Sequence, residues 1–191
     1  MKSALAMVAV AGLLLFVAGA AHSSSDSRPD PPASFASVLL ALRTAVTATG
    51  NDLQHERYDA AHPSYGVCYN LLNNIDAEYN NGVQYDMTND VSFQIGRLET
   101  DIGHVRGDLQ SLKSDDKVLA NDGDPAPAGE SETISNGYGA IHAATVIANG
   151  YVRQANKYSS QAYDLANSIA SKHCSGQGPS GPPSPIAAVG G

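Results

Sequence analysis

The sequence contains few basic side chains for its length of 191 residues. Lysine and arginine number 11, against 19 aspartate and glutamate residues, so the formal net charge is −8 at pH 7. Non-specific binding to nucleic acid needs a cationic surface that neutralises phosphates, and adhesion to anionic lipid needs the same charge. The composition therefore argues against both classes of partner.

The sequence also lacks the short motifs of the common catalytic sites. It has no Gly-x-Ser-x-Gly, no His-Glu-x-x-His and no phosphate-binding glycine loop. Asp101 and His104 are spaced to share a helical face, but no nucleophile accompanies them. We therefore expect a protein without catalytic activity.

Beyond the first 20 residues, no stretch is apolar enough to span a membrane. Lys2, a largely apolar run over residues 4–17 and the small residues 18–20 are typical of a cleaved secretory signal over residues 1–20. An uncleaved anchor is the alternative, because about 18 apolar residues reach the lower limit for a span. Cleavage would remove one base and no acid, changing the net charge from −8 to −9. We expect a secreted or envelope-associated protein, and the alanine-rich, lysine-poor usage is typical of a GC-rich bacterium.

Cysteine is scarce, with only Cys68 and Cys174 present. In an exported protein an isolated pair most simply forms one structural disulfide. Two free thiols would suit a cytosolic protein better. Metal binding by the pair is disfavoured because the sequence has no Cys-x-x-Cys.

Both ends of the chain have the composition of linkers. Residues 21–34 are rich in Ser, Pro and Asp, and residues 175–191 are rich in Gly, Pro and Ser. Such segments bury little apolar surface, so we predict that both are disordered. Residues 35–174 then form one folded domain, which is long enough to bury a core.

Strand signals are nearly absent, whereas helical spacing is frequent. The clearest stripe repeats every 3.5 residues and consists of Val91, Ile95, Leu98, Ile102, Val105, Leu109 and Leu112. A first helix is predicted over about residues 35–60, where Pro63 follows and ends it. A third helix is predicted over about residues 133–173, after a loop at 121–132 that contains Asp-Gly and two prolines. The sequence predicts an all-α fold.

The second predicted helix begins at Cys68 and forms a long antiparallel hairpin with the third, which Cys174 closes. A disulfide between them would then staple the free tips of the hairpin. At 1.5 Å per residue the second helix would exceed the third by about 15 Å. We therefore expect a kink or break at Asn80, Asn81 and Gly82, which are poor helix formers, or an early end near Ser114. With the first helix added, the prediction is a three- to four-helix bundle.

The seam of residues 91–112 suggests how such a protein would function. A long apolar seam on a helix packs on another helix, in this chain or in another. The first functional hypothesis is therefore a helical interaction or structural protein with an unidentified protein partner, which self-associates if the seam is left uncovered. Inhibition of a secreted enzyme is a further possibility without a motif behind it.

The second hypothesis is an extracellular carrier of haem or metal that uses His55, Tyr58 and His62. Their spacing of three and four residues places them on one helical face, and imidazole and tyrosinate are known haem or metal ligands. The fragment YDAAHP also resembles the Tyr-x-x-x-His-Pro element of mycobacterial secreted haem carriers, over six of 191 residues. That resemblance implies haem as the ligand. The alternative is that His62 interacts with the negative end of the helix dipole and that Tyr58 packs.

Two other groups of side chains suggest weaker sites. Nine tyrosines and no tryptophan would allow an aromatic ligand groove between the second and third helices, although such residues more often lie at the edge of a core. The acidic residues around the 121–132 loop lack the EF-hand spacing for Ca²⁺. We expect that loop to be solvated.

Overall fold

The structure is a computed structural model that describes residues 33–175, 177–179 and 181–190. The predicted signal of residues 1–20 and residues 21–32 of the predicted linker lie outside this part of the chain. Every regular element in the described residues is helical, and a disulfide joins Cys68 to Cys174. The predicted all-α class and the predicted disulfide are therefore confirmed.

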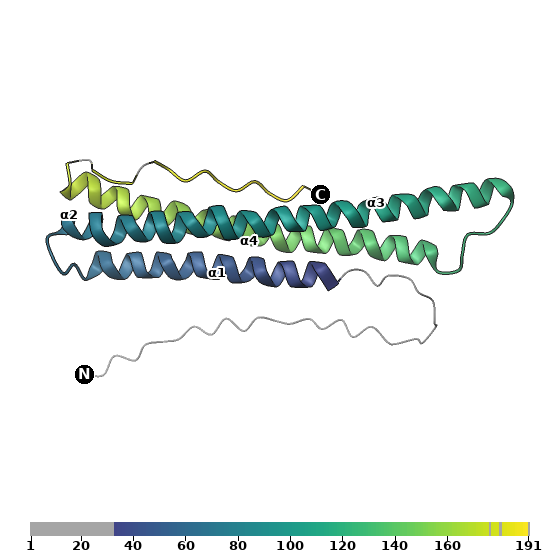
Figure 1. Cartoon of the computed structure of the whole chain (residues 1–191), viewed down its shortest axis with the longest axis horizontal. Helices are drawn as coiled ribbons and strands as arrows, with labels where there is room; N and C mark the ends of the chain where they lie inside the picture. The colour runs from purple at the N-terminus through teal and green to yellow at the C-terminus, as the bar shows by residue number, and fades with distance from the viewer. Residues whose placement is uncertain (1–32, 176, 180, 191) are drawn as a thin grey trace, which may run out of the picture.

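Three helical rods lie side by side (Figure 1). The first is α1 (Ala33–Ala61) and the third is α4 (Glu130–His173). The second rod runs without interruption through α2 (Val67–Asn70), η1 (Leu71–Ile75), η2 (Glu78–Val83), η3 (Asp86–Val91) and α3 (Ser92–Asp122). Residues at its internal junctions keep right-handed helical backbone angles.

The break predicted at Asn80, Asn81 and Gly82 does not occur, because these residues lie inside the π-helical segment η2. A π-helix bonds each carbonyl to the N–H five residues on and so has more residues per turn than an α-helix. Asparagine amides support the wide turns by donating to the carbonyl four residues earlier. Asn80 donates to Asp76 (2.9 Å), and Asn73 donates to Tyr69 (2.8 Å).

The apolar residues of this stretch explain why the rod widens. The buried residues recur at intervals of four and are Leu71, Ile75, Tyr79, Val83, Met87 and Val91. On an α-helix of 3.6 residues per turn, this interval would carry the stripe steadily around the rod. The wider π-helical turns keep the stripe facing α1 and α4. Leu71 is buried and its neighbour Leu72 is exposed, so the stripe of this stretch begins at Leu71.

The predicted 91–112 seam is covered by the chain itself. Its members Val91, Ile95, Leu98, Ile102 and Leu109 are buried in one apolar cluster with residues of α1 and α4. Half of the buried positions on α4 are alanine, which lets the rods approach closely; these are Ala144, Ala148, Ala155, Ala162, Ala166 and Ala170. The condition under which the seam would drive self-association is therefore not met in this structure.

The excess length of the second rod is accommodated without an early end. The rod continues to Asp122, well past Ser114. Figure 1 shows α3 extending beyond the start of α4, with the connecting loop running back to it. The π-helical segments also advance less per residue than an α-helix, because more residues share each turn.

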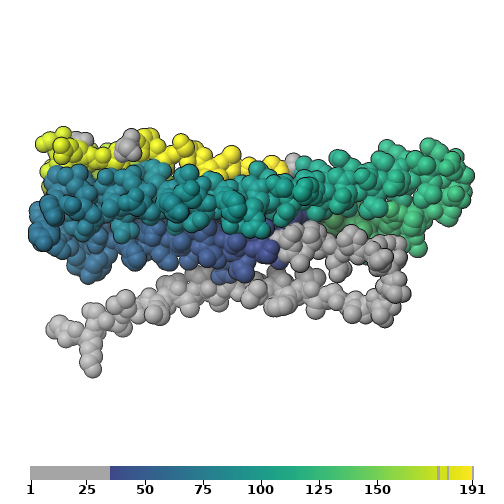
Figure 2. Space-filling view, in the orientation of Figure 1, coloured from purple at the N-terminus to yellow at the C-terminus, as the bar shows by residue number. Residues whose placement is uncertain are grey.

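The C-terminal segment differs from the disorder that its composition predicts. Residues 177–179 and 181–190, which we term the strap, turn back after α4 and lie along the rods (Figures 1 and 2). Val189 is buried, and the side chains of Asn149 and Asn156 hydrogen-bond the strap backbone. Specific partners on α4 therefore order a segment that buries little surface of its own.

Candidate metal site between α1 and η2

Three side chains with metal-binding atoms converge where α1 packs on η2. Asp52 and His55 are three residues apart on α1 and share a face, and Glu78 is the first residue of η2. One donor atom from each side chain lies within 4.8 Å of the other two. Asp52 and Glu78 are half-buried and His55 is exposed. The site therefore borders solvent and is open to a small ion.

Gly82 allows the two rods to approach closely at this point. It lies one turn after Glu78, and a Cβ atom at this position would be 2.8 Å from Oδ2 of Asp52. Real side chains do not tolerate this separation, so any larger residue would displace the Asp52 carboxylate. Glycine at position 82 thus places Asp52 beside η2.

The electrostatics of the cluster favour an added cation. Burial, followed by the negative charge of Asp52, raises the pKa of Glu78, while His55 lowers it. Burial also raises the pKa of Asp86 to about 6, and the nearby charges of Asp52 and Asp90 act in the same direction. A hydrogen bond between the Asp86 and Asp52 carboxyl groups contributes to this rise. A proton or a metal ion at the cluster would relieve this repulsion.

The donor set suits a divalent transition metal. One imidazole nitrogen and two carboxylate oxygens are ligands that Zn²⁺ accepts, with water completing the coordination. Ligand distances of about 2.0–2.2 Å would place neighbouring donors roughly 3.4 Å apart. The donor atoms therefore have to approach one another by at most about 1.4 Å from the 4.8 Å limit. His55 is exposed and the two carboxylates are only half-buried, which allows this movement.

The structure does not bring the predicted set of His55, Tyr58 and His62 together as one cluster. Tyr58 stacks on His62 with 4.3 Å between ring centroids, and both side chains are exposed. Nδ1 of His62 also lies 2.9 Å from the carbonyl oxygen of Tyr58. His55 is two turns, or about 10 Å, from His62 along α1. Haem binding by these three residues stays a prediction.

A buried carboxylic acid lies near the cluster, on the inner side of α1. Glu56 has no exposed surface, and neither of its carboxyl oxygens has a hydrogen-bond partner among the described residues. Burial raises the pKa of Glu56 to about 8, with Arg57 opposing the rise and Glu78 adding to it. Glu56 is therefore mostly protonated at neutral pH, and it is not available as an anionic ligand.

The aromatic groove proposed from the tyrosine content is not seen as such. Tyr79 is fully buried, accepts a hydrogen bond from Gln84 (2.7 Å) and packs against Tyr163 with 5.9 Å between ring centroids. Tyr69 and Tyr85 are exposed. Tyr79 thus belongs to the core, and the other two face solvent.

None of the helices in the described part of the chain has both the length and the apolar character that a bilayer span requires. Comparison with protein-family models, with curated proteins and with solved structures found no match. The site is therefore interpreted from its own geometry and chemistry.

Proposed function

We propose that the protein is an extracytoplasmic helical bundle without catalytic activity that binds a divalent transition-metal ion such as Zn²⁺. Asp52, His55 and Glu78 supply the ligands. The observation that carries this proposal is the convergence of three donor atoms from two separate helices. The metal-binding hypothesis drawn from the sequence is thereby kept, but two of its three ligands are replaced.

The location outside the cytoplasm is supported by the disulfide between Cys68 and Cys174. Disulfides persist in oxidising compartments and are rare in the cytosol. The predicted secretory signal of residues 1–20 agrees with this location.

Isothermal titration of the metal-free protein with ZnCl₂ tests the proposal. We expect one site per chain, and His55→Ala should weaken binding about tenfold or more, as loss of a metal-site residue does. His62→Ala is the matched control, because it removes an exposed histidine that directly follows the last residue of α1. Glu78→Gln should weaken binding while keeping the shape of the side chain.

Two results would count against the site. Wild-type protein that binds no Zn²⁺ would end the metal proposal altogether. Equal losses in His55→Ala and His62→Ala would show that the ion is held by exposed histidines in general and not by the α1–η2 cluster.

A further inference from the structure

Two asparagine side chains of α4 hold the strap by its backbone. Nδ2 of Asn156 donates to the carbonyl oxygen of Ile186 (2.9 Å), and Oδ1 of Asn156 accepts the Ile186 N–H (2.9 Å). Asn149 makes the same pair of bonds with Val189, at 3.3 and 2.7 Å. The backbone N–H and carbonyl groups of Ile186 and Val189 are thereby satisfied. This recognition depends on an extended backbone more than on particular side chains.

The spacing of the two asparagines matches the spacing of the strap. Asn149 and Asn156 are seven residues apart on α4, which corresponds to two turns and about 10 Å. Ile186 and Val189 are three residues apart, which in an extended polyproline-type chain corresponds to about 9 Å. The distance between the two asparagines along α4 therefore nearly equals the distance between Ile186 and Val189 along the strap. Both pairs of hydrogen bonds can then form at the same time.

Other contacts fix the strap along the rods. Val189 is 3 % exposed and belongs to the main apolar cluster, against which Ile186 also packs. The Tyr79 hydroxyl donates to the carbonyl oxygen of Gly181 (3.1 Å). At Gly178 the chain passes so close to Ala170 that a Cβ atom would be 2.6 Å from the Ala170 Cβ. The strap is fitted to this groove at both ends.

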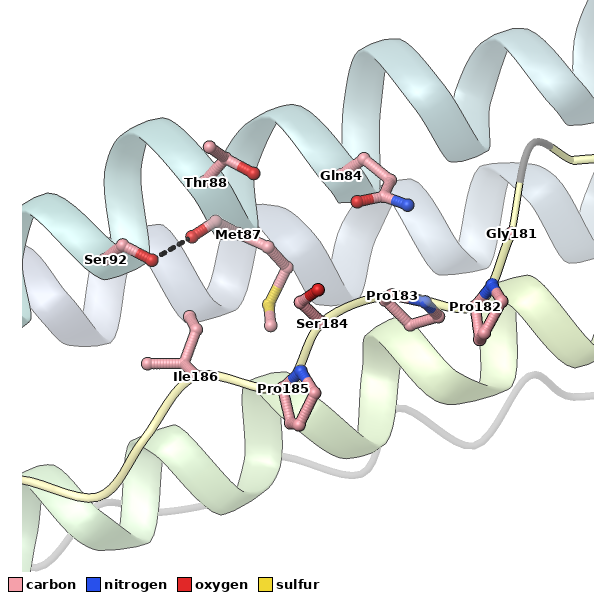
Figure 3. Close-up of a pocket in the computed structure, with 10 residues that line it drawn as sticks. All are labelled: Gln84, Met87, Thr88, Ser92, Gly181, Pro182, Pro183, Ser184, Pro185 and Ile186. Atoms are coloured by element: carbon pink, nitrogen blue, oxygen red, sulfur yellow. Dashed lines mark hydrogen bonds between the residues drawn. The ribbon is translucent and has the colours of Figure 1, made fainter.

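The middle of the strap is packed loosely. An open cavity of about 450 Å³ lies between the strap and the second rod. Its lining is drawn in Figure 3 and consists of Gln84, Met87, Thr88, Ser92 and the strap residues 181–186. Three of these strap residues are prolines, which have no N–H to donate. The strap is thus held at separate anchors, and release does not require a continuous ladder of hydrogen bonds to break.

A strained residue connects the strap to α4. Ser175 has φ of 53° and is the one described non-glycine residue with positive φ. The left-handed conformation is unfavourable for residues with a Cβ. Ser175 directly follows Cys174, whose disulfide fixes the end of α4, and the Gln177 N–H donates to the Cys174 carbonyl oxygen (3.0 Å), so the chain turns directly after α4. Straightening this hinge would relieve the strain and direct the strap away from its own rods.

We propose that the strap is exchanged between two copies of this chain, which form an elongated head-to-head dimer. In one chain the strap runs from the end of α4 back towards its start (Figure 1). Suppose that a two-fold axis places a second copy end to end with the first, so that the two α4 C-termini meet. A straightened strap of the first copy would then continue into the strap groove of the second copy, in the same direction as the second copy's own strap. Each strap would then occupy the partner's groove with the same anchors. A closed two-fold dimer results, not an open chain of copies.

The end of the molecule at which the two copies would meet carries exposed aromatic side chains. Tyr65 and Tyr69 are 68 % and 55 % exposed, and their rings touch at 4.8 Å between centroids. Leu72, one turn after Cys68, is 48 % exposed. Because Cys68 is bonded to Cys174, this patch lies beside the hinge. Strap exchange would bring the two patches together and shield them from water. Removal of apolar surface from water is favourable and would stabilise the dimer.

Paired substitutions at the hinge test the exchange. Proline cannot adopt positive φ, so Ser175→Pro should exclude the closed strap and favour the dimer. Ser175→Gly removes the strain of the closed form and should favour the monomer. Relative to wild type, we expect the dimer dissociation constant to fall in Ser175→Pro and to rise in Ser175→Gly, each by about tenfold. Light scattering after size exclusion gives the mass, and small-angle scattering should show a nearly doubled maximum dimension.

A groove variant separates strap exchange from simple contact between the two ends. Asn156→Ala removes two backbone bonds far from the aromatic patch and should return Ser175→Pro to a monomer. A synthetic peptide of residues 177–190 should also dissociate the dimer by competing for the groove.

Two outcomes would overturn the exchange. A Ser175→Pro protein that stays monomeric at every concentration would overturn the exchange. If that monomer also bound the peptide of residues 177–190, its groove would instead accept a segment of another protein. A dimer unaffected by Asn156→Ala would show that the straps are not exchanged.

Discussion

At the scale of single residues, Glu56 is the least expected side chain in the molecule. It occupies an inward position on α1, near Leu53 and Tyr79, where an apolar residue would satisfy the helix stripe. A buried carboxyl without a hydrogen bond is costly, and protonation is the cheaper of its two states. Glu56 therefore makes the stability of this region depend on pH.

The stability of the protein should fall as pH rises through the range set by Glu56. Its pKa is about 8 in the folded chain against an ordinary value of 4.5, so the folded state binds the proton more tightly than the unfolded state. The stabilisation from protonated Glu56 is complete below about pH 4.5 and is lost as pH rises through about 8, by a few kcal/mol in order of magnitude. Glu56→Gln, which cannot ionise, should flatten this dependence.

Urea unfolding at pH 5 and pH 9 measures the difference. Glu56→Gln should be closest to wild type at pH 5 and more stable than wild type at pH 9. The control is Glu99→Gln, at an exposed position on α3, which should change neither value by much. Parallel pH profiles for wild type and Glu56→Gln would show that Glu56 does not titrate in this way.

The candidate metal site was only partly predictable at this scale. His55 was identified from its spacing on a helix, and Asp52 is on the same face, so the same argument would have reached it. Glu78 lies on another rod, and no spacing within one helix specifies which residues of two rods meet. Tyr58 and His62 satisfied the spacing rule equally well, but near the end of α1 they stack on each other.

At the scale of elements, the second rod shows what periodicity predicts and what it leaves open. The helix was expected to begin at Cys68, and its long apolar stripe was identified, but the expected break at residues 80–82 and the alternative early end near Ser114 are both absent from the structure. The glycine and asparagines at 80–82 predicted a break on propensity alone. Their wide π-helical turn was foreshadowed by the strict four-residue interval between Ile75, Tyr79 and Val83, which fits neither an α-helix nor a 3.5-residue seam.

Gly82→Ala should distort the contact between α1 and η2. The added Cβ would be 2.8 Å from Oδ2 of Asp52, so the carboxylate or the rods must move. Overpacking of this kind costs about 1 to 3 kcal/mol, partly offset by the better helix propensity of alanine. We expect lower stability in urea unfolding and weaker Zn²⁺ binding.

Gly103→Ala is the matched control for this substitution. Gly103 is also within a helix, and a Cβ atom added there would meet no other side chain or neighbouring helix within 4 Å. Alanine there should stabilise the protein by up to about 1 kcal/mol. If Gly82→Ala were as stabilising as Gly103→Ala and bound Zn²⁺ as wild type does, the close approach would not limit the site.

At the scale of the whole molecule, the sequence predicted the helices and the disulfide but not the strap. Cysteine count and export argued for the bond between Cys68 and Cys174, and the antiparallel layout placed them together. The strap could not be predicted because composition measures what a segment buries by itself. Its order comes from Asn149 and Asn156, whose polar side chains look like ordinary surface residues of α4 until their partners are known.

The disulfide should account for a large part of the stability of the whole molecule. Cys68 and Cys174 are 106 residues apart, and a cross-link closing a loop of this length is worth about 4 to 5 kcal/mol in the chain-entropy model. The double variant Cys68→Ser with Cys174→Ser should lose stability of up to this size in urea unfolding. Wild type treated with a reductant serves as the control and should lose a similar amount. Zn²⁺ binding should persist in the folded double variant, because Asp52 and Glu78 are positioned by the packing of η2 on α1 and not by the disulfide. Loss of metal binding together with the disulfide would show instead that the covalent link at the end of the rods determines the register of the site.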